Sequence, residues 1–325
     1  MNHHAQTGAP ALTPQTAETL LLNHIVSEST CWSVLKASGQ GLREYLQGQI
    51  TQDIARLKPE QGIHACLLSP QGKAVSELYI LQAAGDELIL LTPSYVATET
   101  VARLRRFALG YQMRIGIMDA YAVYSVQGTG ATRALADIGL PEPGETWLSR
   151  SRHPDEDVFA LLMPKQPPGY WIIGRHDWLA QRLSDRVSED QCEALRIIRG
   201  LPRFGSEWDV SLHPLNANLI EFDGVSFDKG CYVGQEVTGR MHWRGGIKKK
   251  LYRVLLPDMQ AEHPPQTLPC PVVSTGRIGE LRSMAFDQDR QCFGIALLPI
   301  STVQEDMPLH LENGSVIRVL EPCHA

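Results

Sequence analysis

The octapeptide 229–236, with the sequence K-G-C-Y-V-G-Q-E, is the part of this 325-residue chain best equipped for chemistry. A neighbouring ammonium such as that of Lys229 lowers the pKa of a thiol, and the thiolate is the form that attacks electrophiles and binds metals. Gly230 and Gly234 weaken any regular element, so they indicate special backbone angles or close approach to a ligand. A free cysteine is usually buried and inert, but these neighbours favour a working thiolate at Cys231.

The same octapeptide resembles the K-G-C-[FY]-x-G-Q-E signature of the YgfZ family, a branch of the GcvT-like folate-binding proteins. The resemblance extends from about Trp32 to about Tyr252. It implies an α+β fold of two ferredoxin-like subdomains plus a C-terminal β-barrel around a central ligand cavity. It also implies a folate-binding accessory factor in the assembly or repair of iron–sulfur clusters, which supports tRNA modification indirectly.

This resemblance gives the signature residues their expected roles. Cys231 and Lys229 are the working pair, and the thiolate would hold iron, sulfide or a persulfide in transit. The supporting loop comprises Gly230, Tyr232, Gly234, Gln235 and Glu236. One thiolate cannot hold a cluster, so an iron–sulfur assembly protein, a client enzyme or a small thiol must supply further ligands. No stable metal site is expected, because the seven cysteines are scattered and form no Cys-x-x-Cys.

Other motifs are expected at the cavity. Trp32 matches a tryptophan that lines the family's folate site, and an indole suits stacking on a pterin, although a half-buried core tryptophan is an equal alternative. Residues 45–53 (Y-L-Q-G-Q-I-T-Q-D) and 214–219 (P-L-N-A-N-L) resemble segments that line the cavity in the family. Without the resemblance, the first of these is a helix end and a polar turn. The polar candidates for ligand contact are Gln47, Thr51, Asp53, Asn216 and Asn218.

One departure from the family pattern bears on the cofactor. Residues 196–200 (R-I-I-R-G) resemble R-[LI]-E-A-G, whose glutamate pairs with pterin N–H groups, but Ile198 occupies that position. Each buried donor left without an acceptor costs about 1–3 kcal/mol. We therefore expect weak or altered binding of tetrahydrofolate or a derivative, with Asn216, Asn218 and Glu221 as substitute acceptors.

A second departure bears on the reaction. Aminomethyltransferases of the GcvT type carry an aspartate just after the turn that residues 69–73 (S-P-Q-G-K) resemble, and it assists one-carbon transfer. The segment here is A-V-S-E-L, in which Glu77 is one methylene longer. This difference favours an accessory factor over a classical enzyme. A tetrahydrofolate-dependent one-carbon (aminomethyl) transferase is the alternative.

The composition limits partners and location. The net charge of −6 disfavours direct nucleic-acid binding, because phosphate contacts need lysine and arginine. The segment from Arg240 to Arg253 is locally basic, and it is either a solvated domain edge or a contact site for a polyanion such as tRNA or for an acidic protein. No membrane-spanning run and no signal-peptide pattern are present, and scattered thiols suit a reducing compartment. We expect a cytoplasmic protein, as a monomer.

The elements that must position these residues mix strands with helices, which indicates α+β layering. Strands are expected at 31–37, 64–68, 74–81, 88–91, 113–118, 123–126, 158–163 and 170–173. Helices are expected after residue 41 and at 93–107, 131–138, 178–187 and 192–198. Short β-like runs between 251 and 320 indicate a small barrel or sandwich. The expected organisation is a flexible tail (1–25), a folate-binding region (26–248) and a barrel (249–325).

Overall fold

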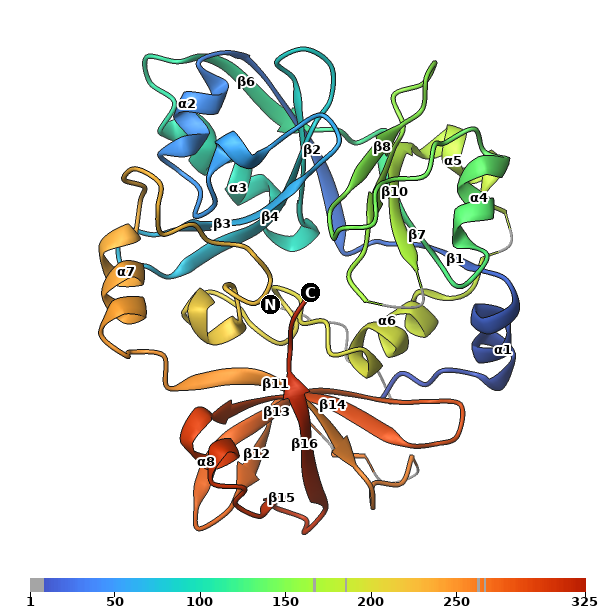
Figure 1. Cartoon of the computed structure of the whole chain (residues 1–325), viewed down its shortest axis with the longest axis vertical. Coiled ribbons are helices and arrows are strands. Elements are labelled where there is room, and N and C mark those ends of the chain that lie inside the picture. Colours follow the sequence, from blue (N-terminus) through green and yellow to red (C-terminus); the bar gives the residue numbers. More distant parts are fainter. Residues whose placement is uncertain (1–8, 166–167, 185, 262–263, 266) are drawn as a thin grey trace.

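The computed structural model describes residues 9–165, 168–184, 186–261, 264–265 and 267–325, which form two five-stranded antiparallel sheets and a closed barrel (Figure 1). The first sheet has the order β3-β4-β5-β2-β6. Its strands are β2 (Trp32–Gln40), β3 (Ile63–Leu68), β4 (Ala74–Gln82), β5 (Leu88–Pro93) and β6 (Gln112–Ile117), with helices α2 (Leu42–Gln47) and α3 (Ala97–Arg106) and 3-10 turns η1 (Ile54–Arg56) and η2 (Ser94–Val96).

The second sheet has the order β1-β7-β10-β9-β8. Its strands are β1 (Ile25–Glu28), β7 (Tyr121–Gln127), β8 (Arg150–Arg152), β9 (Phe159–Leu162) and β10 (Gly169–Arg175), and its helices are α1 (Pro14–Leu22), α4 (Ala131–Asp137), α5 (His176–Arg182) and α6 (Glu189–Ile198). The two sheets share one apolar cluster, in which Trp32 and Leu91 of the first meet Phe159 and Trp171 of the second. This packing joins the sheets above the middle of the molecule.

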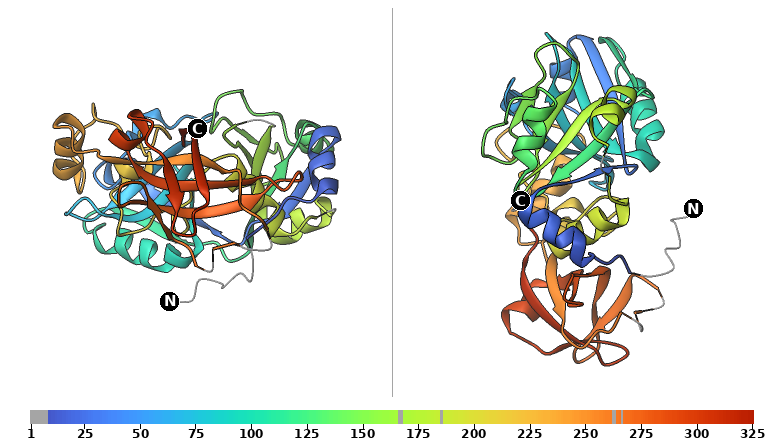
Figure 2. Two further views of the ribbon diagram at one scale, coloured as in Figure 1. Left: turned by 90° about the horizontal axis from the view of Figure 1, so that it is seen from below. Right: turned by 90° about the vertical axis from the view of Figure 1, so that its right-hand side faces the viewer.

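The C-terminal strands close into a barrel with the order β11-β14-β13-β12-β15-β16. They are β11 (Lys249–Leu256), β12 (Cys270–Val273), β13 (Arg277–Phe286), β14 (Cys292–Pro299), β15 (Leu309–Leu311) and β16 (Val316–Pro322), with α8 (Ile300–Gln304) beside them. Together with the two sheets, this barrel confirms the expected α+β class and architecture. Between sheets and barrel lies a layer that contains α6 and η3 (Pro214–Ala217), while α7 (Gln235–Trp243) stands at the outer flank (Figures 1 and 2).

The N-terminal segment differs from the expected tail. Residues 1–8 lie outside the described residues, but 9–25 are ordered. Thr13 caps α1 by accepting a hydrogen bond from the backbone N–H of Thr16. Leu12 and Leu20 are buried in one cluster with α6 and with Ala285 of β13. Their burial against elements distant in the sequence explains why composition alone indicated a tail.

Two other boundaries also differ from expectation. Helix α5 ends at Arg182 rather than near residue 187. Helix α7 was not expected, and it follows Gly234, whose φ of 85° lies in the left-handed region. No described helix has the length and apolar character needed to cross a membrane.

Candidate functional site

Lys229 anchors the signature loop (residues 229–236) to the body of the protein. The Lys229 side chain is buried, and its Nζ donates to the carbonyl oxygens of Ile50 (2.8 Å) and Gln52 (2.9 Å). Burial lowers the pKa of Lys229 to about 8, and the neighbouring Asp53 opposes that shift. The ammonium also lies 5.0 Å from the centre of the buried Tyr232 ring. Lys229 therefore holds the loop to the protein, a role different from the expected pairing with the Cys231 thiolate.

The segment expected to line the cavity instead supports this loop. Thr51 is fully buried, and its hydroxyl donates to the carbonyl of Gly224 (2.6 Å) and accepts from the N–H of Cys66 (2.8 Å). Gln47 donates to the Asp53 carboxylate (2.9 Å), which also caps η1. The hydrogen-bonding groups of these side chains are occupied by backbone groups and by one another. Gln47, Thr51 and Asp53 are absent from the described cavity lining, which corrects the sequence-based expectation.

On the signature loop itself, Cys231 is exposed to solvent. A Cβ added at the neighbouring Gly230 would meet no atom within 4 Å, so open space surrounds this part of the loop. At Gly234 a Cβ would lie 2.7 Å from the carbonyl oxygen of Ser69, so only glycine allows this close approach. The Gln235 amide lies 3.5 Å from the carbonyl oxygen of Gly230, and Glu236 pairs with Arg240. The loop thus presents one accessible thiol on a fixed backbone.

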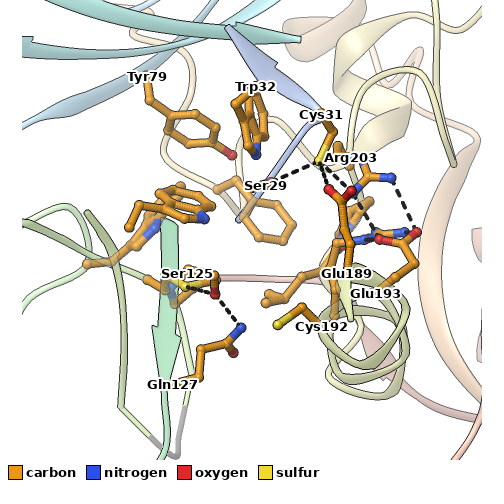
Figure 3. Close-up of a pocket in the computed structure, with 18 residues that line it drawn as sticks. Ser29, Cys31, Trp32, Tyr79, Ser125, Gln127, Glu189, Cys192, Glu193 and Arg203 are labelled. Carbon is orange, nitrogen blue, oxygen red and sulfur yellow. Dashed lines mark hydrogen bonds and ion pairs between the residues drawn. The ribbon is translucent and has the colours of Figure 1, made fainter. Parts of the chain in front are cut away.

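A separate cavity of about 720 Å³, its open mouth included, lies between the two sheets and α6 (Figure 3). Trp32 and Tyr79 lie on one side of it, Ser125 and Gln127 on the opposite side, and Glu189 with Arg203 along a third. Its described lining comprises Ser29, Cys31, Trp32, Tyr79, Ser125, Gln127, Trp147, Met163, Pro164, Trp171, Glu189, Cys192, Glu193, Arg196, Leu201, Pro202, Arg203 and Phe222. Cys231 is not part of this lining, so the structure separates the expected thiol site from the expected ligand site.

The cavity walls are rich in aromatic rings. The Trp32 ring packs edge-on against Tyr79 (5.3 Å between centroids) and Trp171 (6.0 Å). Trp147 adds a fourth ring, and its buried Nε1 has no hydrogen-bond partner among the described residues. A wall of flat rings with an unused donor suits a flat heterocyclic ligand.

An ion-pair network forms the polar wall of the cavity. Arg196 binds Glu193 (2.7 Å) and Glu207 (2.8 Å), and Arg203 binds Glu193 from the other side (2.9 Å). Burial alone raises the pKa of Glu193, but the two guanidinium groups outweigh it and lower this pKa to about 2. The network fixes the last turns of α6 to the loop that follows and keeps charge at the cavity wall.

Two thiols face this cavity. The Sγ of Cys31 lies 3.3 Å from Nη1 of Arg203 and 3.6 Å from Oε1 of Glu189. Burial raises the pKa of Cys31, and Arg203 only partly opposes the shift. Burial likewise raises the pKa of Cys192 to about 11. Both thiols are therefore protonated near neutral pH.

Asn218 is a structural residue, contrary to expectation. It is fully buried, its amide donates to the carbonyls of Leu251 (2.9 Å) and Cys323 (2.8 Å), and its carbonyl accepts from the N–H of Leu251 (2.8 Å). Its φ of 64° is one that asparagine tolerates well. Neither Asn216 nor Glu221 lines the described cavity, so neither replaces the glutamate missing at Ile198.

Glu77 lies behind the cavity wall. It is buried, with Oε1 2.9 Å from His64 Nε2 and 3.3 Å from the Tyr79 hydroxyl, and Oε2 accepts from the N–H of Phe204 (3.1 Å). His64 Nδ1 lies 2.9 Å from the carbonyl oxygen of Phe222. Both ring nitrogens thus lie next to oxygen atoms, so Glu77 and the Phe222 carbonyl together hold the imidazole ring in place. Both oxygens of the Glu77 carboxylate have partners within the core, and the carboxylate does not face the cavity.

Sequence reasoning found Trp32 but missed most of the cavity. Tyr79, Trp147 and Trp171 come from distant segments, and no spacing relates them. A weaker signal was available in α6, where Glu189, Glu193 and Arg196 recur at helical spacing and therefore share one face. That periodicity identifies a polar helix face but not what it faces.

The structure resembles that of the glycine cleavage system aminomethyltransferase T from Bartonella henselae, with a TM-score of 0.81 and 18% identity over 100% of this chain and 92% of that one. This likeness confirms the GcvT-like fold. A scan of protein-family models gave no match.

Curated relatives carry the name tRNA-modifying protein YgfZ. The one from Hamiltonella defensa is 31% identical over 229 residues, which cover 68% of this chain and 67% of the relative. Those from Escherichia coli O157:H7 and Klebsiella pneumoniae are 28% and 29% identical, with 68% of each chain covered. With this similarity and the GcvT-like fold, the chain belongs to the YgfZ family of tRNA-modifying proteins.

Proposed function

We propose that the protein is a YgfZ-type accessory factor in the assembly or repair of iron–sulfur clusters, with Cys231 as its working thiol. The exposed position of Cys231 on a loop fixed by Lys229 and Gly234 carries this proposal. A group that passes iron or sulfur to another protein must be accessible, and its loop must keep its shape during approach. Support for tRNA modification would follow indirectly, through client enzymes that need clusters.

In this role Cys231 supplies one thiolate ligand to iron, and the partner supplies the remaining ligands. Among the described residues, no three His, Cys, Asp or Glu side chains are grouped to hold a metal ion. Iron, alone or with bridging sulfide, would be cargo that is ligated jointly by Cys231 and the thiols of an assembly protein, a client enzyme or a small molecule. The open space around Gly230 suits such shared ligation.

The cavity suits tetrahydrofolate or a derivative as the bound ligand. Its aromatic walls suit a pterin ring. Trp32 and Tyr79 would hold the ring, and Trp147 Nε1 would donate to it. A bound folate would supply a carrier for one-carbon units. Because Ile198 replaces the usual glutamate, the ligand needs another acceptor. Glu189 is the candidate, since it is the carboxylate on the described lining that forms no ion pair with an arginine.

Complementation tests the role of Cys231. Cells lacking the endogenous protein would receive wild type, Cys231→Ala or Cys292→Ala, at equal protein levels. The readout is the activity of a labile [4Fe–4S] enzyme. We expect wild type and the Cys292→Ala control to restore activity and Cys231→Ala to fail. Full restoration by Cys231→Ala would refute the proposed thiol chemistry.

Calorimetry with tetrahydrofolate tests the cavity. Trp32→Ala should weaken binding by about ten-fold, from the loss of ring contacts worth about 1.5 kcal/mol. Trp178→Ala is the matched control, because Trp178 lies on α5 outside the described cavity lining. No binding by wild type, or equal loss in both variants, would contradict a folate site at this cavity.

The one-carbon transferase remains the alternative. The burial of Glu77 against His64 and Phe204 counts against it, because this carboxylate cannot reach a substrate in the cavity. Turnover of tetrahydrofolate with an amine donor would favour the alternative. Such turnover should then fall in a Trp32→Ala variant and persist in Cys231→Ala.

A further inference from the structure

Helix α7 leaves one face uncovered at the outer flank of the molecule (Figures 1 and 2). Val237 is 38% exposed and Trp243 is 74% exposed, and Arg240 and Arg244 are exposed beside them. These positions follow helical spacing, so they share a stripe along α7. Lys248 and Lys249 follow in the chain, where β11 begins at Lys249. We call these six residues the α7 surface.

The charge of this surface is only partly compensated. Glu236 pairs with Arg240 at 2.7 Å. Lys250, the next residue along, pairs with Glu221 and lies outside the stripe. Among the described residues, no carboxylate forms an ion pair with Arg244, Lys248 or Lys249. Screening limits electrostatic reach to about 8 Å at physiological salt, so these cations act locally despite the net charge of −6.

An aromatic stack supports the exposed indole. The rings of Phe227 and His242 stack with centroids 3.9 Å apart and an interplanar angle of 12°. Trp243 packs edge-on against His242 (4.6 Å) and Phe227 (6.2 Å). These contacts restrict the indole while leaving most of it in solvent. A large aromatic ring held open to water requires a reason, because its exposure costs hydrophobic stabilisation.

We propose that the α7 surface binds a single-stranded segment of RNA, a role additional to that of Cys231. Proteins that bind single strands combine cations that follow the phosphates with aromatic rings on which bases stack. Arg244, Lys248 and Lys249 would contact phosphates, and Trp243 would stack on a base. An acidic protein fits less well, because Trp243 and Val237 offer little apolar area and stable protein interfaces bury about 800 Å² a side.

Fluorescence anisotropy with the full chain tests this proposal. The probes are a labelled 12-nucleotide polyuridylate, an unmodified tRNA transcript and a polyglutamate peptide of equal charge. Trp243→Ala should weaken binding of polyuridylate about ten-fold, and Trp243→Phe should retain most of it. The double variant Lys248→Glu/Lys249→Glu should reduce the slope of log affinity against log salt by about 1.4.

A matched charge control is available elsewhere on the chain. The double variant Lys58→Glu/Arg133→Glu changes the net charge equally at exposed positions away from α7, and it should bind like wild type. No RNA binding by wild type at 50 mM salt, or equal weakening by the control, would overturn the proposal. So would unchanged affinity in Trp243→Ala. Polyglutamate binding as tight as RNA binding would instead assign the surface to an acidic protein.

Discussion

Cys231 differs from the other cysteines of the chain in its surroundings. Cys66, Cys292 and Cys323 are buried, and burial raises the pKa of each thiol, to about 12 for Cys292. Burial also raises the pKa of Cys270 to about 11. Because the thiolate is the reactive form, these environments suppress reactivity. Cys231 differs in being exposed, so a reagent reaches its thiol without any opening of the fold.

We therefore predict that iodoacetamide at pH 7.5 labels Cys231 at least on the order of ten-fold faster than any other cysteine of the folded protein. Peptide mass spectrometry over a time course provides the measurement. Urea-unfolded protein is the control, in which the seven cysteines should react at similar rates. Faster labelling of Cys31 or Cys192 would show that the cavity, rather than the signature loop, carries the reactive thiol.

Among the elements, the segment around η3 connects the middle layer to the barrel through Asn218. Its amide bridges β11 and the C-terminal segment by three hydrogen bonds to buried backbone groups. Removal of one partner leaves such groups unsatisfied, at about 1–3 kcal/mol each. The asparagine therefore serves as a connector between elements.

We predict that Asn218→Ala lowers the free energy of unfolding by about 3 kcal/mol and leaves the tetrahydrofolate affinity of the folded fraction unchanged. Asn216→Ala is the control, because Oδ1 of Asn216 has no partner among the described residues, and its cost should be small. Urea titration and calorimetry provide the two readouts. Loss of ligand affinity without loss of stability would restore Asn218 as a ligand contact.

The Glu193–Arg196–Arg203 network predicts acid sensitivity of α6. The pKa of Glu193 is about 2 in the folded protein, below its ordinary value of 4.5. The unfolded chain therefore binds more protons between these values, and stability is lost as pH falls through that window. The difference corresponds to roughly 3 kcal/mol.

The test compares wild type with Glu193→Gln by urea titration at pH 6 and pH 3. Wild type should lose more stability between the two pH values than Glu193→Gln, which should already be weaker at pH 6. Glu236→Gln, at an exposed carboxylate, should behave like wild type. Parallel losses in wild type and Glu193→Gln would mean that other carboxylates govern acid unfolding.

At the scale of the whole molecule, the N-terminal segment joins parts that the chain places far apart. The Leu12 N–H donates to the carbonyl of Phe286 (2.8 Å) on β13, and the Leu12 side chain packs in the cluster that includes α6. Thr13 N–H donates to Gln191 of α6 (2.9 Å). The segment therefore connects the barrel with the cavity helix.

We predict that Leu12→Ala lowers the free energy of unfolding by about 2–4 kcal/mol. Hydrogen exchange should also increase in β13 and α6. Leu21→Ala removes the same atoms from a side chain that is 69% exposed, so it should change stability little. Equal, small effects of both variants would return residues 9–25 to the status of a loosely attached tail.

The signature loop, the α+β class and a C-terminal barrel or sandwich were predictable from local sequence patterns, and the family resemblance favoured the barrel. K-G-C-Y-V-G-Q-E is contiguous, and the strand runs after Lys250 are short and separated by turn residues. Hydrophobic periodicity and turn residues act over a few positions, so they can be recognised in the sequence without knowledge of the tertiary structure.

Which residues face the cavity and which support the loop could not be predicted, because long-range packing sets both. Thr51 and Asn218 carry polar groups that suit a ligand, yet each is hydrogen-bonded to backbone groups of distant segments, 173 and 105 residues away in the chain. Conversely, Tyr79, Trp171 and Arg203 meet at the cavity only through the packing of the two sheets on α6. Long-range partners decide whether a polar side chain is free for a ligand, and no local pattern encodes those partners.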